Sequence, residues 1–270
     1  MPVRRPRVLV TNDDGVAAEG LRRLAAFALE QGLDVLVAAP GSEASGSGTS
    51  RAVPAGGLVR VDPVNLPGLP GISAHAVAGP PALIVTAACQ GIFGAPPELV
   101  LSGINPGANV GNSVLHSGTV GAVLTAARYG CPGAAVSIDI GAELHWQTAL
   151  VALERVLPVV LPGSRVRDRP PVVLNVNAPA LPPDELRGIR AVGPGGEPAV
   201  RFSTARVDSG SFRVSYRAAA PAGAGGDVGA LAAGYATVTA LRTVQEDLEV
   251  PLPVPRFVPG HSRHPDGVLG

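Results

Sequence analysis

The stretch Val8–Gly15 constrains the fold most, because a short apolar run there ends in two adjacent carboxylates and a glycine. Residues 8–10 have the β-branched and aliphatic character of a strand that is buried within a parallel sheet. Asp13 and Asp14 follow it directly. In an open α/β sheet, ligands bind just beyond the carboxyl ends of the strands. We therefore expect the two aspartates to lie at a ligand-binding edge.

Two interpretations of this aspartate pair remain open at this point. No basic residue follows until Arg22, so two neighbouring carboxylates would repel each other unless a cation neutralises them. Oxygen ligands of this kind are preferred by Mg²⁺ and Mn²⁺. The alternative is a solvated turn in which Asp14 caps the helix that follows.

Strand-like and helix-like patterns alternate over the first 180 residues. Strands are predicted at 8–10, 34–39, 58–61, 74–77, 99–101, 134–138 and 171–176. Helices are predicted at 16–31, 80–90, 120–129 and 143–157, with Pro158 ending the last one. This alternation predicts an α/β fold with a Rossmann-like, three-layer parallel sheet and right-handed crossovers.

The pattern changes beyond about residue 181. Segments 201–207 and 211–218 partly alternate apolar and polar residues around Asp208-Ser209-Gly210, which predicts a β-hairpin, and 234–241 resembles another strand. We expect an α/β catalytic core over 1–180, a β-rich extension over 181–250 that serves oligomerisation, and an irregular tail over 251–270.

The composition excludes several classes of protein. The 21 basic and 21 acidic residues give a net charge of zero, which argues against a binder of nucleic-acid duplexes or membrane surfaces. Cys89 and Cys131 are the only cysteines, so neither a disulfide framework nor a zinc site is expected. We expect no signal peptide and no membrane span, and hence a cytoplasmic protein.

Further oxygen donors follow two other predicted parallel strands. Ser45 lies in the small, polar loop 41–50, and Asn105 and Asn109 lie in the glycine-containing loop 102–111. Together with the aspartates they offer a partial octahedral shell for a hard cation. Read singly, the first loop also fits a flexible linker, and the asparagines also fit turn positions.

A fourth element, residues 116–119, precedes the helix predicted at 120–129. The unpaired amides and the dipole at a helix N-terminus attract phosphate. Alternatively, Ser117 or Thr119 simply caps the helix, and His116 is a satisfied core histidine. A cation site next to an anion site indicates phosphoryl chemistry.

Three motifs resemble those of the SurE family: residues 10–15, residues 102–109 and residues 117–120. Segments 174–177 and 234–239 are also similar to later segments of that family, so the resemblance spans about residues 7–242. It implies a metal-dependent 5′/3′-nucleotidase that hydrolyses nucleoside monophosphates and assembles as a homodimer or homotetramer.

The resemblance also implies residue roles. It makes Asp13 and Asp14 catalytic, with one Mg²⁺ or Mn²⁺ ion per subunit. The expected metal ligands are Asp13, Asp14, Ser45 and Asn105. The expected substrate- and phosphate-binding residues are Asn12, Gly46, Asn109, His116, Ser117, Gly118 and Thr119.

The chain departs from the family pattern at three places. Gly79–Ile84 lacks a threonine and an aspartate that the family usually has, Ala44 replaces a common glutamine, and Ala240 replaces a frequent proline. The change at Gly79–Ile84 bears on substrate preference, and it motivates a rival interpretation, a nucleotide-binding or regulatory module without hydrolysis. A dinucleotide oxidoreductase is a weaker rival, because no G-x-G-x-x-G follows the first strand.

Overall fold

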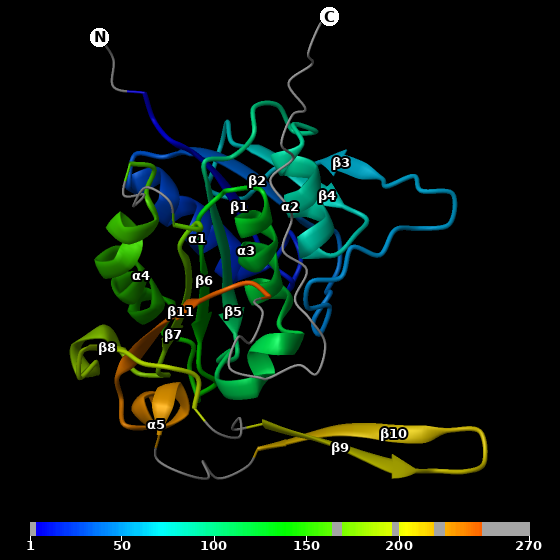
Figure 1. Cartoon of the computed structure of the whole chain (residues 1–270), viewed down its shortest axis with the longest axis vertical. Coiled ribbons are helices and arrows are strands. Elements are labelled where there is room, and N and C mark those ends of the chain that lie inside the picture. The colour runs from blue at the N-terminus through cyan, green and yellow to red at the C-terminus, as the bar shows by residue number, and fades with distance from the viewer. Residues whose placement is uncertain (1–3, 164–168, 196–199, 219–224, 245–270) are drawn as a thin grey trace, which may run out of the picture.

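The computed structural model describes residues 4–163, 169–195, 200–218 and 225–244 (Figure 1). Most strands belong to one mixed sheet with the spatial order β3-β4-β2-β1-β5-β6-β7-β11-β8. The strands are β1 Arg7–Thr11, β2 Asp34–Pro40, β3 Val61–Pro63, β4 Ser73–Val77, β5 Leu99–Pro106, β6 Gly133–Ile138, β7 Val173–Ala178, β8 Ile189–Ala191 and β11 Ala236–Leu241.

The central strands, from β4 through β2, β1, β5 and β6 to β7, are parallel throughout. The chain begins in the middle of this series and reverses direction across the sheet between β1 and β5. This is the switch point of a Rossmann-like sheet, beside which ligands bind. The predicted fold class is confirmed.

Two helical layers cover the sheet (Figure 1). Helix α1 (Glu19–Glu30) contacts α4 (Trp146–Val160) on one face, and α2 (Pro81–Cys89) contacts α3 (Gly118–Arg128) on the other. Leu24 of α1 and Leu153 of α4 lie in one buried cluster, whereas Val85 of α2 and Val123 of α3 lie in another. Aliphatic side chains fill both layers, as a chain with 3% aromatic residues requires.

The predicted end of the fourth helix is wrong, because α4 continues through Pro158 to Val160. Proline lacks the amide that would bond the carbonyl of Glu154, but Glu154 is exposed and water can reach it. Leu157 and Val160 are almost fully buried, and their burial holds the last turn in place. The strand expected at 58–61 is β3, shifted to Val61–Pro63.

Beyond residue 180, two strands, β8 and β11, join the main sheet, and a separate two-stranded hairpin lies between them in the chain. Strand β11 pairs antiparallel with β7, and β8 pairs with β11. Short helices η1 (Gly111–His116), η2 (Pro183–Glu185) and α5 (Gly226–Ala232) were not predicted. The predicted hairpin is confirmed as β9 (Val200–Arg206) and β10 (Phe212–Ala218), which project from the body as an arm (Figure 1). The tail predicted at 251–270 lies outside the described residues.

Candidate metal and phosphate site

Asp13 and Asp14 lie just beyond the carboxyl end of β1, at the switch point of the sheet. Asp13 is only 4% exposed and Asp14 is half-buried. Helix α1 begins after Ala18 and receives no side-chain cap. The alternative of a solvated turn with Asp14 as a helix cap is therefore wrong.

Asn12 shapes the turn that carries the aspartates. Its side-chain amide donates to the carbonyl of Gly15 at 3.0 Å, and its side-chain oxygen accepts from the Gly15 amide at 3.2 Å. Both ends of a fully buried side chain are thus engaged within the loop. The structure gives Asn12 a loop-forming role, and the predicted contact with substrate stays a prediction.

The N-terminus of α3 faces Asp13. The Thr119 hydroxyl donates a short hydrogen bond to Asp13 Oδ1. Burial raises the pKa of Asp13, while this hydrogen bond and the backbone amides of Thr119 and Gly118 oppose the rise. Ser117 caps the helix, since its hydroxyl accepts from the Val120 amide at 3.1 Å. The helix start is therefore adjacent to the aspartate pair, as expected.

Asp14 carries an unusual charge environment. Desolvation, followed by repulsion from Asp13 and Glu43, raises the pKa of Asp14 to about 7. Its Oδ2 atom is buried and has no hydrogen-bond partner. A buried carboxylate oxygen without a proton donor is the kind of atom that a cation would satisfy.

The available donor set consists of oxygen atoms. Within the described part of the chain, no group of three or more His, Cys, Asp or Glu side chains could hold a metal ion. A cation beside Asp13 and Asp14 would therefore need neutral oxygens as well. Such a mixed set suits Mg²⁺ or Mn²⁺ rather than Zn²⁺.

Asn105 is positioned by an irregularity in β5. The pairing register between β5 and β6 shifts between Ser102 and Asn105, which re-aims the strand end. Gly103 has φ +135°, and a Cβ there would lie 2.3 Å from the Val136 carbonyl oxygen. The side-chain Nδ2 of Asn105 donates to the Gly107 carbonyl at 2.6 Å. Asn105 stays a predicted ligand.

The loop 41–50 turns a different serine inward from the one predicted. Ser45 and Gly46 are exposed, whereas the Ser47 hydroxyl is buried and lies beside Asp13 near Gly118. Ser45 stays a predicted ligand. Sequence reasoning missed Ser47, because the loop contains several small polar residues and no period that distinguishes them.

Asn109 is anchored in the sheet. Its backbone amide donates to Asn177 Oδ1 at 2.8 Å, and its side-chain amide donates to Ser137 Oγ at 2.9 Å. Its carbonyl accepts from Asn175 Nδ2 at 2.8 Å and from Asn177 Nδ2 at 3.1 Å. Asn175 and Asn177 therefore clamp the loop, a role that the sequence analysis did not assign. Two asparagines alternating with apolar residues in a buried strand were the signal that could have revealed them.

Replacing Asn177 by aspartate will loosen this clamp. The carboxylate keeps an acceptor for the Asn109 amide but loses the donor to the Asn109 carbonyl and brings a buried charge. We expect a loss of about 1–3 kcal/mol in the free energy of unfolding and a raised KM for phosphate esters. Chemical denaturation and steady-state kinetics measure the two effects. Asn112, an exposed asparagine nearby, provides the control Asn112→Asp, and equal behaviour of both variants would contradict a clamp.

Two more buried hydroxyls lie under the site. Thr11 of β1 pairs with Ser102 of β5, and neither side-chain oxygen has a hydrogen-bond partner. Leu9 and Val100, two residues earlier in each strand, pack in the cluster beneath α2 and α3. Alternation along the strands places the Thr11 and Ser102 hydroxyls on that same face. Unsatisfied polar atoms are thus concentrated at this edge.

The structure also shows where His116 and the segment Gly79–Ile84 lie. His116 is exposed at the end of η1, so the alternative of a core histidine is wrong. Its carbonyl accepts from the Gly48 amide at 3.1 Å.

The segment Gly79–Ile84 follows β4 and forms the start of α2, with Ala82 and Ile84 fully buried. The departure from the family pattern therefore places apolar core residues there, and its effect on substrate preference stays a prediction.

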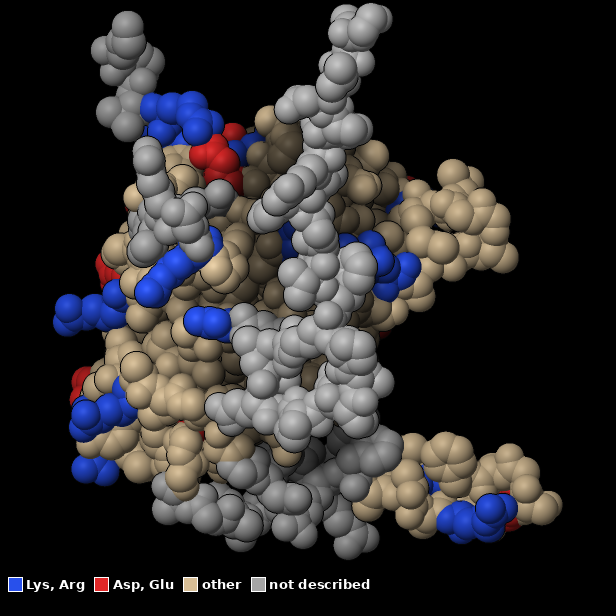
Figure 2. Space-filling view, in the orientation of Figure 1, with Lys and Arg blue, Asp and Glu red and all other residues tan. Residues whose placement is uncertain are grey.

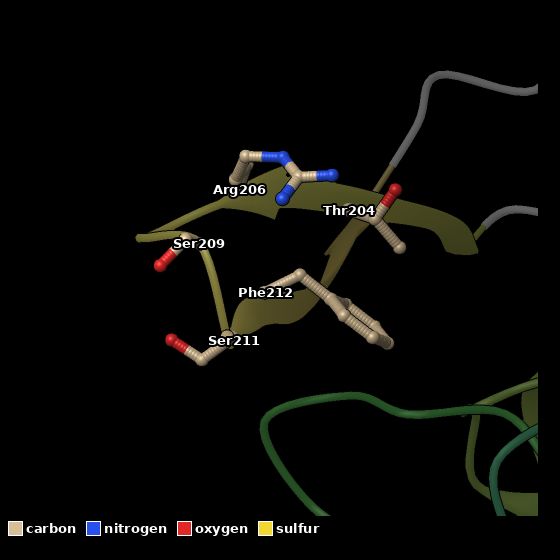
Figure 3. A pocket seen from close by; sticks show the side chains of 6 residues that line it. Thr204, Arg206, Ser209, Ser211 and Phe212 are labelled. Carbon is tan, nitrogen blue, oxygen red and sulfur yellow. The ribbon is translucent and has the colours of Figure 1, made fainter.

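A separate hollow lies on the hairpin arm (Figure 3). It is lined only by arm residues, Thr204, Arg206 and Ser209–Phe212, and none of these belongs to the predicted site. Figure 3 shows the Phe212 ring and the Arg206 side chain standing out from the ribbon.

Comparisons with known proteins agree with the geometry. The family described as "Survival protein SurE" matches residues 8–199. A relative from Syntrophobacter fumaroxidans, named 5′-nucleotidase SurE, is 39% identical over 202 residues, which cover 75% of this chain and 78% of the relative. One of the same name from Methylococcus capsulatus is 38% identical over 196 residues and 68% of each chain.

A solved structure supports the fold. The crystal structure of the SurE protein from Aquifex aeolicus aligns with a TM-score of 0.69 at 27% identity. The alignment covers 88% of this chain and 93% of that one. The match therefore extends over most of the architecture described above.

Proposed function

The chain belongs to the SurE family, and on this premise we propose that it is a phosphatase that hydrolyses nucleoside monophosphates to nucleoside and phosphate. The observation that carries the proposal is the aspartate pair at the sheet switch point, set against the N-terminus of α3. The names of the relatives specify the 5′-phosphate. Action on 3′-phosphates is our extension from the family resemblance.

We propose one divalent cation per subunit, Mg²⁺ or Mn²⁺, as the cofactor. The residues fit such an ion, because Asp14 Oδ2 is buried without a partner and the surrounding donors are hard oxygens. Asp13, Asp14, Asn105 and Ser45 are the proposed ligands. When bound, the ion would act as a Lewis acid on the phosphoryl group and lower the pKa of a water molecule.

The residues of the chain contribute orientation and charge. Thr119 fixes the Asp13 carboxylate through its hydroxyl, and Asn12 closes the turn that carries both aspartates. The amide groups and dipole at the start of α3 favour the negative charge of the phosphoryl oxygens. Of the proposed substrate- and phosphate-binding residues, Ser117, Gly118 and Thr119 lie at this helix start. The others are Asn109, in the loop between β5 and η1, and Asn12, Gly46 and His116.

Water is the proposed nucleophile. An aspartate nucleophile of the haloacid-dehalogenase kind normally occurs in an Asp-x-Asp-x-Thr motif, which the sequence lacks. Attack by Asp13 or Asp14 would form an acyl-phosphate, and its hydrolysis by water at phosphorus would be a second displacement, so the configuration at phosphorus would be retained overall. Direct attack by water is a single displacement and inverts the configuration, which a substrate with a chiral, isotopically labelled phosphoryl group reveals.

The test is a panel of nucleoside 5′- and 3′-monophosphates incubated with the metal-free chain and with Mg²⁺ or Mn²⁺. We expect phosphate release that depends on the ion. Binding of the ion and of nucleotide without phosphate release would instead favour the non-hydrolytic module. No observation here favours that alternative.

The raised pKa of Asp14 gives a pH-dependent stability. The folded-state value of about 7 exceeds the ordinary value of 3.8, so the folded chain holds a proton that the unfolded chain has lost between these pH values. The metal-free protein should therefore lose stability as the pH rises from 6 to 8. Thermal unfolding at the two pH values measures this.

Two controls isolate the contribution of Asp14. Asp14→Asn should be less pH-sensitive than the wild type, because the titrating group is absent. Saturating Mn²⁺ should stabilise the wild type more at pH 8 than at pH 6, since protons compete with the cation. A wild type and an Asp14→Asn variant with the same pH dependence would contradict the assignment.

We propose that the hairpin arm mediates assembly into a homodimer or homotetramer. An isolated two-stranded hairpin is marginally stable at best in water. Val207 and Phe212 on the arm are 56% and 67% exposed, and Val214 is 41% exposed. Figure 2 shows the arm projecting from the body with its surface open on this face. The proposal includes the division of the chain into a catalytic core over 1–180 and an extension over 181–250 that serves oligomerisation.

Replacing Phe212 by serine should shift the protein towards smaller species. Light scattering coupled to size exclusion measures the mass as a function of concentration. Phe93, which lies in the α2 layer and not on the arm, provides the control Phe93→Leu. An unchanged mass for the Phe212 variant would contradict assembly through the arm.

A cytoplasmic location stays a prediction. Within the described ranges, no helix combines the length and apolar character needed to cross a bilayer.

A further inference from the structure

The Ser47 hydroxyl lies beside Asp13, but Ser47 is neither a proposed metal ligand nor a predicted phosphate-binding residue. Its Oγ atom is buried and has no hydrogen-bond partner. A Cβ built on Gly118 would lie 2.7 Å from Ser47 Oγ and 2.8 Å from Asp13 Oδ2. Both oxygens therefore lie close to the Gly118 backbone in the first turn of α3.

The turn that carries Ser47 is fixed through its backbone, while the Ser47 hydroxyl makes no hydrogen bond of its own. The flanking glycines Gly46 and Gly48 have φ of +79° and +51°, values that other residues rarely adopt. The Ser47 amide donates to the Ala44 carbonyl at 3.2 Å, and the Ser47 carbonyl accepts from the Ser50 amide at 2.9 Å. The turn is thus fixed from within.

The same turn is fixed to both halves of the site. The Ala44 amide donates to the Asp13 carbonyl at 2.7 Å, and the Gly48 amide donates to the His116 carbonyl at 3.1 Å. A Cβ on Gly121 of α3 would lie 2.0 Å from the Gly48 carbonyl oxygen, so the turn touches the helix backbone directly. The position of Ser47 is therefore set relative to Asp13 and to α3 together.

We propose that Ser47 Oγ donates a hydrogen bond to a non-bridging phosphoryl oxygen of the substrate. This inference rests on the proposed function and names one more residue of the same site. Burying a hydroxyl without a partner costs free energy, and a bound phosphoryl group supplies the missing acceptor. The helix N-terminus next to Ser47 favours an anion at this place.

The test compares Ser47→Ala, Ser47→Thr and the wild type by calorimetry, with Mn²⁺ alone and then with inorganic phosphate on the Mn²⁺-loaded protein. We expect Ser47→Ala to keep its Mn²⁺ affinity within about twofold and to bind phosphate at least about tenfold more weakly. Ser47→Thr retains the hydroxyl and should recover most of the phosphate affinity. Ser50→Ala is the matched control, because Ser50 belongs to the same turn and is exposed.

Thermal unfolding separates this role from a structural one. Because the hydroxyl has no partner in the free protein, Ser47→Ala should melt at or above the wild-type temperature. Unchanged phosphate affinity, a loss of Mn²⁺ affinity instead, or a lowered melting temperature with phosphate affinity intact would each overturn the proposal. If the wild type binds phosphate through Ser47 but releases none from nucleoside monophosphates, the proposed hydrolysis fails and this contact stands.

Discussion

Replacing Asp13 by asparagine is expected to abolish metal-dependent release of phosphate, with a fall in kcat/KM of about 10³-fold or more. The Asn side chain has the same shape and keeps an oxygen that can accept from the Thr119 hydroxyl. The variant therefore loses a charge at the cation site without losing the contact that places the residue. Phosphate release from a nucleoside 5′-monophosphate with Mn²⁺ measures the effect.

The exposed Asp184 in η2 provides the matched control. Asp184→Asn should retain wild-type turnover and wild-type affinity for Mn²⁺. Asp13→Asn should fold, which circular dichroism checks, and should bind Mn²⁺ more weakly by calorimetry. Wild-type turnover in Asp13→Asn would refute the role of this carboxylate.

Replacing Gly118 by alanine is expected to lower kcat/KM by about 10²-fold, because small displacements of a reacting geometry have effects of this size. The added Cβ would lie 2.8 Å from Asp13 Cβ and 2.8 Å from Asp13 Oδ2. Ser47 can rotate away, but the Asp13 carboxylate must shift or the start of α3 must move. Either change separates the aspartate from the helix N-terminus.

Alanine is compatible with the first turn of a helix, so the loss of activity is expected to come from the close contact with Asp13 and not from unfolding of α3. The melting temperature should therefore fall little compared with the activity. Gly193→Ala is the control, since a Cβ there would meet no atom within 4 Å. Gly118→Ala with wild-type kinetics would show that the close approach of α3 to Asp13 is not needed.

Much of the fold and the centre of the site followed from the sequence. Residues 8–10 have the character of a buried strand, and acids follow them directly. Because parallel strands bring their carboxyl ends to one edge, Asp13 could be expected near the start of α3. Ser117 as a helix cap was also predictable from its place before an apolar helical pattern. These features depend on local periodicity and on a general rule of sheet topology.

Other features depend on tertiary contacts that leave no local pattern. The burial of the Ser47 hydroxyl depends on the hydrogen bond from the Gly48 amide to the His116 carbonyl and on the packing of Gly48 against α3. The direction of Asn105 is set by a register shift between β5 and β6. The return of β11 to the edge of β7 is a long-range pairing, and Pro158 remains helical because its neighbours are buried.

The most direct measurement is anomalous X-ray diffraction from crystals soaked in Mn²⁺ together with inorganic phosphate. The proposed function predicts one strong anomalous peak per subunit within coordinating distance of the Asp13 and Asp14 carboxylates, with phosphate density between it and the start of α3. A fully occupied Mn²⁺ peak elsewhere, with no peak at the aspartate pair, would contradict the proposed site and the phosphatase activity built on it.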